Sequence, residues 1–235
     1  MSQPTLVKGG RIPSPMVRTT QGEPCERLRE IVLRHQQTEF LRPIALHTVR
    51  EFERVAEVAS EIAGDGLVLD AGCGTGDSTR QLALLHPKHV ILAVDRSQAR
   101  ISRAKQALSG LPNVIIARAN LVDFWRLSLQ SGWHFDYQYL LYPNPSPKKR
   151  QIKRRWHAHP VLPTILKLGG RLELRTNWDI YAKEFYSALE LCGFPAKLER
   201  FAPQQPISAF ERKYLESGHP LFRVISDLMD AGTEP

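Results

Sequence analysis

The sequence has few cysteines, and they are not arranged as a disulfide framework requires. Three occur in 235 residues, at Cys25, Cys73 and Cys192, and their odd number and wide separation indicate reduced, structural thiols. The eight histidines lack the spacing of a zinc site, so no metal is predicted. No apolar run approaches the roughly 18 residues that span a bilayer, and the N-terminus lacks the apolar core of a signal peptide. We therefore expect a cytoplasmic protein without a membrane partner.

Basic residues outnumber acidic ones, with 32 Lys and Arg against 24 Asp and Glu and a net charge of +8. Such a chain attracts polyanions, either nucleic acid or an anionic membrane surface, although the charge can also serve solubility alone. The length and the 42% hydrophobic content are typical of one globular domain. We place that domain at residues 25–230. Residues 1–24, rich in glycine, proline and basic side chains, are predicted to be a flexible basic tail.

Apolar residues alternate between helical and strand spacing along most of the chain. A helical pattern begins near Glu26, and residues 45–63 form a second, amphipathic helix. Strands are then predicted at residues 67–69, 89–94, 113–118, 137–142 and 170–175, and helices at residues 78–85, 97–108, 121–129, 161–167 and 178–192. Residues 196–225 can supply two more strands around a loop that holds residues 208–218. This alternation predicts an α/β, Rossmann-like fold with parallel strands joined by crossover helices.

A glycine-rich turn follows the first strand directly and leads into a helix. It contains Asp70, Gly72, Gly74 and Gly76, and such a turn lets a ligand approach the backbone closely. A dinucleotide site requires a later third glycine and a free helix N-terminus for the diphosphate, but here Asp77 follows and would repel it. S-adenosyl-L-methionine has no phosphate and carries a sulfonium cation, so an acidic rim of Asp70 and Asp77 suits it. The turn therefore predicts this cofactor.

Two further side chains at strand ends fit the same cofactor. Asp95 ends the second strand about twenty residues past the turn and is placed to accept both ribose hydroxyl protons. Asn120 ends the third strand, where its amide can pair with the adenine edge. Asparagine is also a favoured helix N-cap, and the two roles of Asn120 are compatible.

A proline-flanked loop, residues 142–147, runs into a cluster of six cations in eight residues, 148–155. The prolines stiffen the chain just beyond the fourth strand, so the cations are presented beside the cofactor turn. Phosphate neutralisation contributes much of the affinity for RNA, and we assign Lys148, Lys149, Arg150 and Arg154 to RNA binding. A solvated run of charges is the alternative.

From about residue 67 to residue 223 the sequence resembles the bacterial tRNA (guanine-N7) methyltransferase family. The resemblance rests on the segments 70–76, 142–155, 176–182 and 208–212; the loop running into the basic cluster is specific to the family, and the glycine turn is shared with most methyltransferases. It implies a seven-stranded, mostly parallel sheet with helices on both faces and an antiparallel last strand. The implied acceptor is a guanosine of tRNA or another structured RNA, bound by a monomer or a weak homodimer.

The resemblance also implies an acceptor pocket, lined by residues at the matching positions: Asn144, Thr176, Asn177, Ser208 and Glu211. Asn144 and Asn177 stand where the family has aspartate, Ser146 replaces a tryptophan, and Ser208 replaces a threonine. Guanine N7 needs no strong base, so positioning and charge stabilisation dominate its methylation. We assign catalytic roles to Asn144 and Glu211, although asparagine contributes no negative charge.

Several structural alternatives remain for these residues. Thr176 and Asn177 can cap the next helix, and Glu211 can form a surface ion pair with Arg212 or Lys213. Trp178 lies on an apolar helix face, so we expect it in the core rather than stacked on a base. Two other functions also remain open, a small-molecule methyltransferase on the same scaffold and an RNA-binding paralogue with impaired catalysis.

Overall fold

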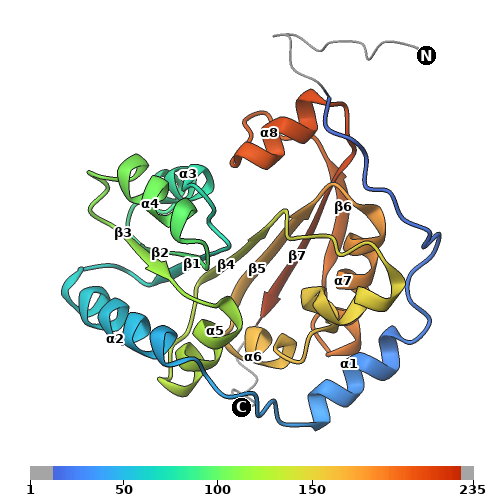
Figure 1. The fold of residues 1–235 in the computed structure, drawn as a ribbon, viewed down its shortest axis with the longest axis horizontal. Helices are drawn as coiled ribbons and strands as arrows, with labels where there is room; N and C mark the ends of the chain where they lie inside the picture. Colours follow the sequence, from blue (N-terminus) through green and yellow to red (C-terminus); the bar gives the residue numbers. More distant parts are fainter. Residues whose placement is uncertain (1–12, 229–235) are drawn as a thin grey trace.

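One seven-stranded sheet organises the computed structural model, which describes residues 13–228 (Figure 1). The strands are ordered β3-β2-β1-β4-β5-β7-β6, and β7 runs antiparallel to both of its neighbours while the other pairs are parallel. Their bounds are β1 Leu67–Ala71, β2 Val90–Asp95, β3 Val114–Arg118, β4 Tyr137–Leu141, β5 Gly170–Thr176, β6 Lys197–Phe201 and β7 Leu221–Leu228. The predicted Rossmann-like architecture is confirmed.

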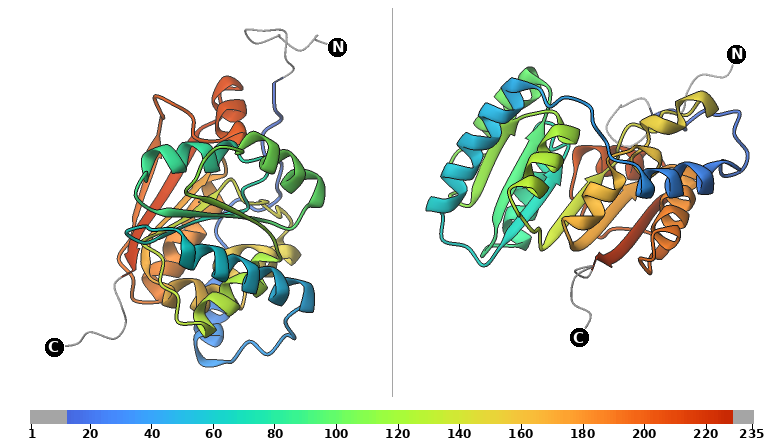
Figure 2. Two further views of the ribbon diagram at one scale, coloured as in Figure 1. Left: turned by 90° about the vertical axis from the view of Figure 1, so that its left-hand side faces the viewer. Right: turned by 90° about the horizontal axis from the view of Figure 1, so that it is seen from below.

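Helices cover both faces of this sheet (Figure 2). The α-helices are α1 Leu28–Gln37, α2 Leu46–Glu61, α3 Asp77–Leu85, α4 Gln98–Ala107, α5 Leu121–Gln130, α6 Leu162–Lys167, α7 Asp179–Leu191 and α8 Ala209–Glu216, and two short 3-10 helices are η1 Lys149–Arg154 and η2 Trp156–Ala158. Within residues 13–228, none of these helices has both the length and the hydrophobicity that a bilayer crossing demands.

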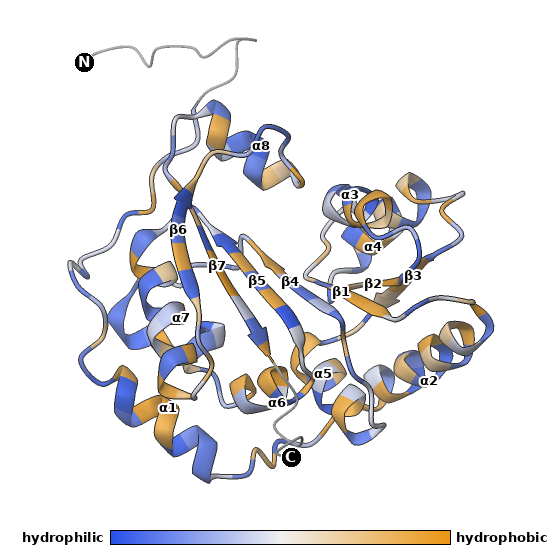
Figure 3. Ribbon diagram, turned by 180° about the vertical axis from the view of Figure 1, so that it is seen from behind, coloured by the Kyte–Doolittle hydropathy of each residue, from blue (hydrophilic) through white to orange (hydrophobic). Residues whose placement is uncertain are grey.

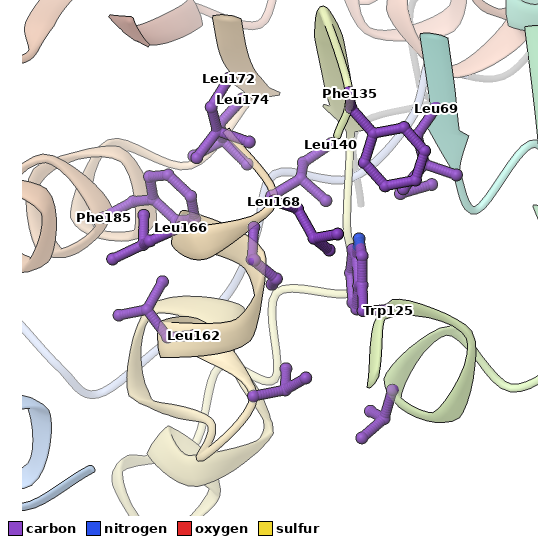
Figure 4. Packing of buried hydrophobic residues seen from close by; sticks show 14 of the residues in the cluster. Leu69, Trp125, Phe135, Leu140, Leu162, Leu166, Leu168, Leu172, Leu174 and Phe185 are labelled. Carbon is purple, nitrogen blue, oxygen red and sulfur yellow. The ribbon is translucent and has the colours of Figure 1, made fainter. Parts of the chain in front are cut away.

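The largest hydrophobic cluster fills one face, where α2, α5, α6 and α7 pack on the sheet. In Figure 4, Leu172 and Leu174 of β5 point toward Leu162, Leu166 and Phe185 of the helices. Because side chains alternate across a strand, the intervening residues of β5 project to the opposite face.

Those intervening residues of β5 are charged. Arg171, Glu173 and Arg175 lie on the face away from the main cluster, where Arg175 pairs with Glu173 at 2.6 Å. On this face the smaller clusters lie under α3 and α4, over β1 and β2. A polar surface therefore remains over β5, beside the end of the sheet that α8 approaches.

Two predicted loops are helical. Residues 208–218 were expected to form a loop, but 209–216 form helix α8, and the Ser208 hydroxyl caps it by accepting from the Glu211 N–H. Serine followed three positions later by glutamate is a helix-start pattern, here Ser208 and Glu211. The basic segment of residues 148–155, also expected to be a loop, contains the 3-10 helix η1, and η2 follows it directly.

Residues 13–24 are not the free tail that the composition predicted, while residues 1–12 lie outside the described part of the chain. Gln21 is 3% exposed, and its amide donates to the Glu184 carboxylate at 2.7 Å. The Thr19 hydroxyl donates to the Pro147 carbonyl at 2.8 Å, and the Ser14 N–H donates to the Ser217 hydroxyl at 2.9 Å. Long-range hydrogen bonds thus hold this segment along the protein, which local composition does not reveal.

Candidate active site

The glycine turn leaves β1 and is fastened to the end of β2. The backbone N–H groups of Gly72 and Cys73 both donate to the Val94 carbonyl, at 2.8 and 3.1 Å. Gly72 and Gly74 have φ of 95° and 58°. Residues that carry a Cβ rarely adopt these positive backbone angles. A Cβ built on Gly72 would have its nearest neighbour 4.0 Å away. The turn is therefore rigid, and its backbone is open to a ligand.

Gly76 has a different role from the first two glycines. Its φ is 91°, and it is the N-cap residue of α3. A Cβ at this position would lie 2.8 Å from a methyl of Leu108 and 3.4 Å from the Cα of Ala104. Glycine here permits close packing of α3 against the end of α4, and the cofactor-binding role of Gly76 stays a prediction.

Asp95 ends β2 directly beside the turn. Its carboxylate accepts from the Ser97 N–H at 2.8 Å and from the Gly74 N–H at 3.2 Å, and Arg100 lies 3.5 Å from the second oxygen. A carboxylate offers about four acceptor positions, so one remains for a ribose hydroxyl without rearrangement. A second becomes free when the largely exposed Arg100 side chain turns away. This geometry fits a nucleoside sugar.

Asp70 does not form a rim for the cofactor, because it is 1% exposed. One carboxylate oxygen accepts from both the Ser78 and the Thr79 hydroxyls at 2.7 Å, which ties β1 to the first turn of α3. Burial raises the pKa of Asp70 to about 6, although the two hydroxyl hydrogen bonds oppose the shift. Asp77, which is half-buried, accepts from the Thr75 hydroxyl at 2.8 Å. Of the predicted acidic rim of Asp70 and Asp77, only Asp77 is therefore left.

The raised pKa of Asp70 predicts a pH-dependent gain in stability when its charge is removed. The folded state binds this proton more tightly than the unfolded chain, so ionisation costs stability as pH rises from about 4 to 6. Asp70→Asn keeps an acceptor oxygen for both hydroxyls. We expect it to match the parent protein near pH 4 and to exceed its free energy of unfolding by about 3 kcal/mol at pH 8, at about 1.4 kcal/mol per pKa unit. Urea unfolding at both pH values tests this, and a pH-independent difference would contradict it.

Asn120 is the N-cap of α5. Its side-chain oxygen accepts from the Val122 N–H at 3.0 Å, and its own N–H lies 3.5 Å from the Thr48 hydroxyl. The capping alternative is confirmed. The amide nitrogen has no partner in this cap and is the free donor for an adenine contact, which stays a prediction.

The basic cluster consists of five exposed cations and one buried arginine. Lys148, Lys149, Arg150, Lys153 and Arg154 are exposed. Arg155 is 0% exposed and donates to the Glu184 carboxylate and to the Ser146 carbonyl. The count of six cations available to phosphates is therefore corrected to five.

The buried partner of Arg155 is Glu184 of α7, which the sequence did not single out. Burial would raise the pKa of Glu184, but the hydrogen bond from His157 and the charge of Arg155 outweigh it and lower the pKa to about 2. The same carboxylate accepts from Gln21 and from the Cys25 N–H. This one side chain therefore joins α7, the basic segment and the N-terminal segment of residues 21–25.

The proline loop shapes the position of Asn144. The Asn144 side-chain oxygen accepts from the Ser146 N–H at 3.0 Å, and Tyr142 and Ser146 both have positive φ, 52° and 45°. Asn144 itself is exposed, whereas Ser146 is buried over the Arg155 guanidinium. The loop thus projects Asn144 outward on a strained, well-braced backbone.

The Thr176–Asn177 pair lies at the end of β5. The buried Thr176 hydroxyl accepts from the Trp178 N–H at 3.2 Å. Trp178 is itself the N-cap residue of α7 and no side chain caps this helix, so the capping alternative for Thr176 and Asn177 is wrong. The Asn177 amide lies 2.9 Å from His219 Nδ1. Trp178 is buried, as expected, and the Arg155 guanidinium lies over its ring at 4.6 Å.

Glu211 is 0% exposed and is not part of a surface ion pair with Arg212 or Lys213. One of its oxygens accepts from the Tyr142 hydroxyl at 2.8 Å, and Arg175 of β5 pairs with it at 3.0 Å. Its other oxygen accepts from the Ile207 N–H at 2.8 Å. Glu211 thus fastens α8 to the ends of β4 and β5, a partnership for which the sequence held no local signal.

The predicted site residues come together because their strands are neighbours. Asp70 of β1 is in register with Tyr139 of β4, and the parallel strands send their following loops to the same edge of the sheet. The glycine turn and the loop of Asn144 leave this edge side by side. Thr176 and Asn177 leave β5 one strand further on, and Glu211 reaches the same place from α8.

The fold and this site define an S-adenosylmethionine-dependent methyltransferase. A 16S rRNA methyltransferase, KamB, shares the fold with a TM-score of 0.55 at 15% identity, covering 81% of this chain and 96% of that one. The 16S rRNA (adenine(1408)-N(1))-methyltransferase from Catenulisporales acidiphilia, solved with SAM as cosubstrate, has a TM-score of 0.55 at 16% identity and covers 78% and 94%.

The chain belongs to the tRNA (guanine-N(7)-)-methyltransferase family. A family model described as "Putative methyltransferase" matches residues 65–224. The tRNA (guanine-N(7)-)-methyltransferase of Halorhodospira halophila is 31% identical over 176 residues, 67% of this chain and 73% of the relative. That of Paracidovorax citrulli is 27% identical over 168 residues, 68% and 67% of the two chains. The resemblance inferred from the sequence motifs is confirmed.

Proposed function

We propose that this protein methylates N7 of a guanosine in tRNA or another structured RNA. The observation that carries the proposal is that the loop of Asn144, which runs into the cationic cluster, leaves the end of β4 beside the glycine turn that follows β1. The cluster itself lies further along the chain, where Arg155 joins it to α7. RNA phosphates held by Lys148, Lys149, Arg150 and Arg154 would bring a base to the edge of the sheet where Asp95 lies. The relatives from Halorhodospira halophila and Paracidovorax citrulli are tRNA (guanine-N(7)-)-methyltransferases, which supports the same acceptor.

Methyl transfer to guanine N7 does not require a strong general acid or base. When bound, the cofactor supplies a methyl group on a sulfonium; the N7 lone pair forms the new C–N bond, and the electron pair of the broken C–S bond stays on sulfur. Because N7 carries no proton, the chain contributes orientation and exclusion of water. Asp95 and the open backbone at Gly72 would hold the cofactor, and the half-buried Asp77 would contribute negative charge that favours a sulfonium cation.

The side-chain amides of Asn144 and Asn177, which are exposed and partly exposed, are the groups that would contact the acceptor base. Asn144 uses its oxygen for the Ser146 N–H, so its amide nitrogen is the group that would contact the base. Asn177 directs its amide nitrogen to His219, so its oxygen would accept from the guanine amine or N1–H. Thr176, Ser208 and the fully buried Glu211 act as positioning residues, because their side chains bind within the protein.

A second candidate is an RNA-binding protein with little or no methyl transfer. Asn144 and Asn177 favour it, since amides at these positions cannot offset the positive charge that develops on the methylated ring. Glu211 does not replace the missing carboxylates at the acceptor, because it is 0% exposed and its oxygens bind Tyr142, Arg175 and the Ile207 N–H.

One experiment separates these functions. Purified protein is incubated with methyl-labelled S-adenosylmethionine and either total RNA or a protein-free metabolite extract, and the RNA is digested to nucleosides. Labelled 7-methylguanosine supports the proposal, and salt-sensitive RNA binding without label supports the second candidate. Label only in small molecules would contradict both.

Removing the exposed cations should weaken RNA binding without affecting the cofactor. For a variant with Lys148, Lys149 and Arg150 all replaced by alanine, we expect the slope of log affinity against log salt to become shallower by about 2 to 3, because up to three phosphate contacts are lost. Filter binding between 50 and 300 mM salt would measure the slope. Lys167→Ala is the control, because this exposed lysine precedes β5 and lies at the opposite edge of the sheet. An unchanged slope would remove the cluster from the RNA site.

A further inference from the structure

Helix α8 presents an aromatic ring to solvent beside the acceptor residues. Phe210 is 48% exposed, and among residues 13–228 no other Phe, Tyr or Trp is exposed. It lies between the helix cap Ser208 and Arg212, and it directly precedes the buried Glu211. Figure 3 shows hydrophobic residues at the end of α8 that points toward the side of the molecule carrying α3 and α4.

The inner face of Phe210 is backed by a stack of rings. Phe210 and Tyr214 are stacked with centroids 6.1 Å apart and planes 25° apart, and Tyr214 and His219 are stacked at 5.1 Å and 23°. His219 is fixed on both sides, by the Asn177 amide at 2.9 Å and the Ser14 carbonyl at 2.8 Å. Because a carbonyl only accepts, Nε2 carries the proton and Nδ1 accepts from Asn177.

This arrangement links the exposed ring to the acceptor site. The stack runs from Phe210 through Tyr214 and His219 to Asn177, and Tyr142 lies against Tyr214 with its centroid 5.5 Å away. The hydroxyl of Tyr142 in turn binds Glu211. Phe210 is thus the outer end of an ordered aromatic column, whose inner end touches residues assigned to the acceptor.

The surroundings of Phe210 suit a nucleobase better than an apolar protein surface. Leu215, the other large hydrophobic residue of α8 that is exposed, is five positions further along and therefore about 140° around the helix. The two do not form one apolar patch. Exposed Arg212 and Lys213 lie on the same helix and attract phosphates. A flat apolar face beside cations matches a base on its phosphate backbone.

We propose that the outer face of Phe210 is a stacking site for one unpaired nucleobase of the RNA, continuing the column of Tyr214 and His219. Stacking on an aromatic ring is the common way in which proteins hold splayed RNA bases. This stacking site rests on the proposed function, because its ligand is a base of the RNA that the protein is proposed to methylate. The site should prefer a single-stranded loop or bulge, because a base within a continuous helix must first be unstacked and unpaired, which costs free energy.

Replacing the ring tests this site. Phe210→Ala should weaken RNA binding and raise the KM for RNA by about 5- to 100-fold, the usual range for loss of one stacked base, with S-adenosylmethionine affinity unchanged. Phe210→Trp should retain RNA binding, and its added fluorescence, taken as the difference from the parent protein, should be quenched by RNA. Leu215→Ala is the matched control, since it removes exposed apolar surface from the same helix without removing a ring.

The outcomes are distinguishable. If the parent protein transfers methyl to RNA but Phe210→Ala shows an unchanged KM, or RNA leaves the Phe210→Trp difference signal unquenched, the stacking site is overturned while the proposed function stands. If Phe210→Ala dissociates a dimer in sedimentation and RNA affinity is unaltered, the ring is a contact between copies and the proposal is likewise overturned. A parent protein that neither binds nor modifies RNA would overturn both proposals.

Discussion

Replacing Asp95 with alanine is expected to weaken S-adenosylmethionine binding about 100-fold, because a hydrogen bond to a charged group contributes about 1.5–3 kcal/mol. The carboxylate has two functions that alanine cannot supply. It accepts the Gly74 N–H at 3.2 Å and so holds the turn, and it keeps an acceptor position for the ribose. Isothermal titration of the parent protein and the variant measures the change.

Two further variants make the Asp95 result specific. Asp95→Asn keeps one acceptor oxygen, so its affinity for S-adenosylmethionine should fall about tenfold. That affinity lies between those of Asp95→Ala and the parent protein. Asp227→Ala removes an exposed carboxylate of β7, whose nearest cation is Arg171 at 3.5 Å, and should leave affinity unchanged. Equal affinities for Asp95→Ala and the parent protein would place the sugar elsewhere.

Replacing Glu184 with alanine should lower the free energy of unfolding at pH 7 by about 3–5 kcal/mol, the usual effect of removing one partner of a buried ion pair. Arg155 would then be left fully buried without its carboxylate, and Gln21 would lose its acceptor. The low pKa of Glu184 means that its contribution is complete above about pH 4.5 and is lost as pH falls toward 2. Urea unfolding monitored by circular dichroism measures the loss.

The matched control for Glu184 is Glu53→Ala, which removes an exposed glutamate of α2 and should change stability by less than about 0.5 kcal/mol. A double variant, Glu184→Leu with Arg155→Met, removes both charges and should recover part of the loss. If Glu184→Ala were as stable as the parent protein, the buried network would not be what holds the basic segment to α7.

The sequence predicts the parallel half of this fold well because its signals are local. The strand at Leu67–Ala71 and the helix at Asp77–Leu85 are short, regular and separated by glycines, so periodicity and turn chemistry agree. Asp95 could be singled out since strand ends in such sheets face ligands. These features require no knowledge of distant contacts.

The acceptor side was harder to predict because its contacts join distant parts of the chain. Glu211 and Arg175 are 36 residues apart, and Gln21 and Arg155 are 134 apart. Hydrophobic periodicity carries no information about such distant pairs. Nor does the sequence distinguish the buried Arg155 from the five exposed cations that precede it. The capping pattern that begins at Ser208 was the one local signal that could have revealed α8.

Hydrogen–deuterium exchange with and without S-adenosylhomocysteine, the demethylated product, tests the central claim most directly, because it reports where a nucleoside cofactor binds. The structure predicts protection in peptides that cover residues 70–77 and 94–98, where the glycine turn meets Asp95, and no change in β6. Absence of protection at these two segments, or protection confined to another part of the sheet, would contradict the assignment of the cofactor site and the function built on it.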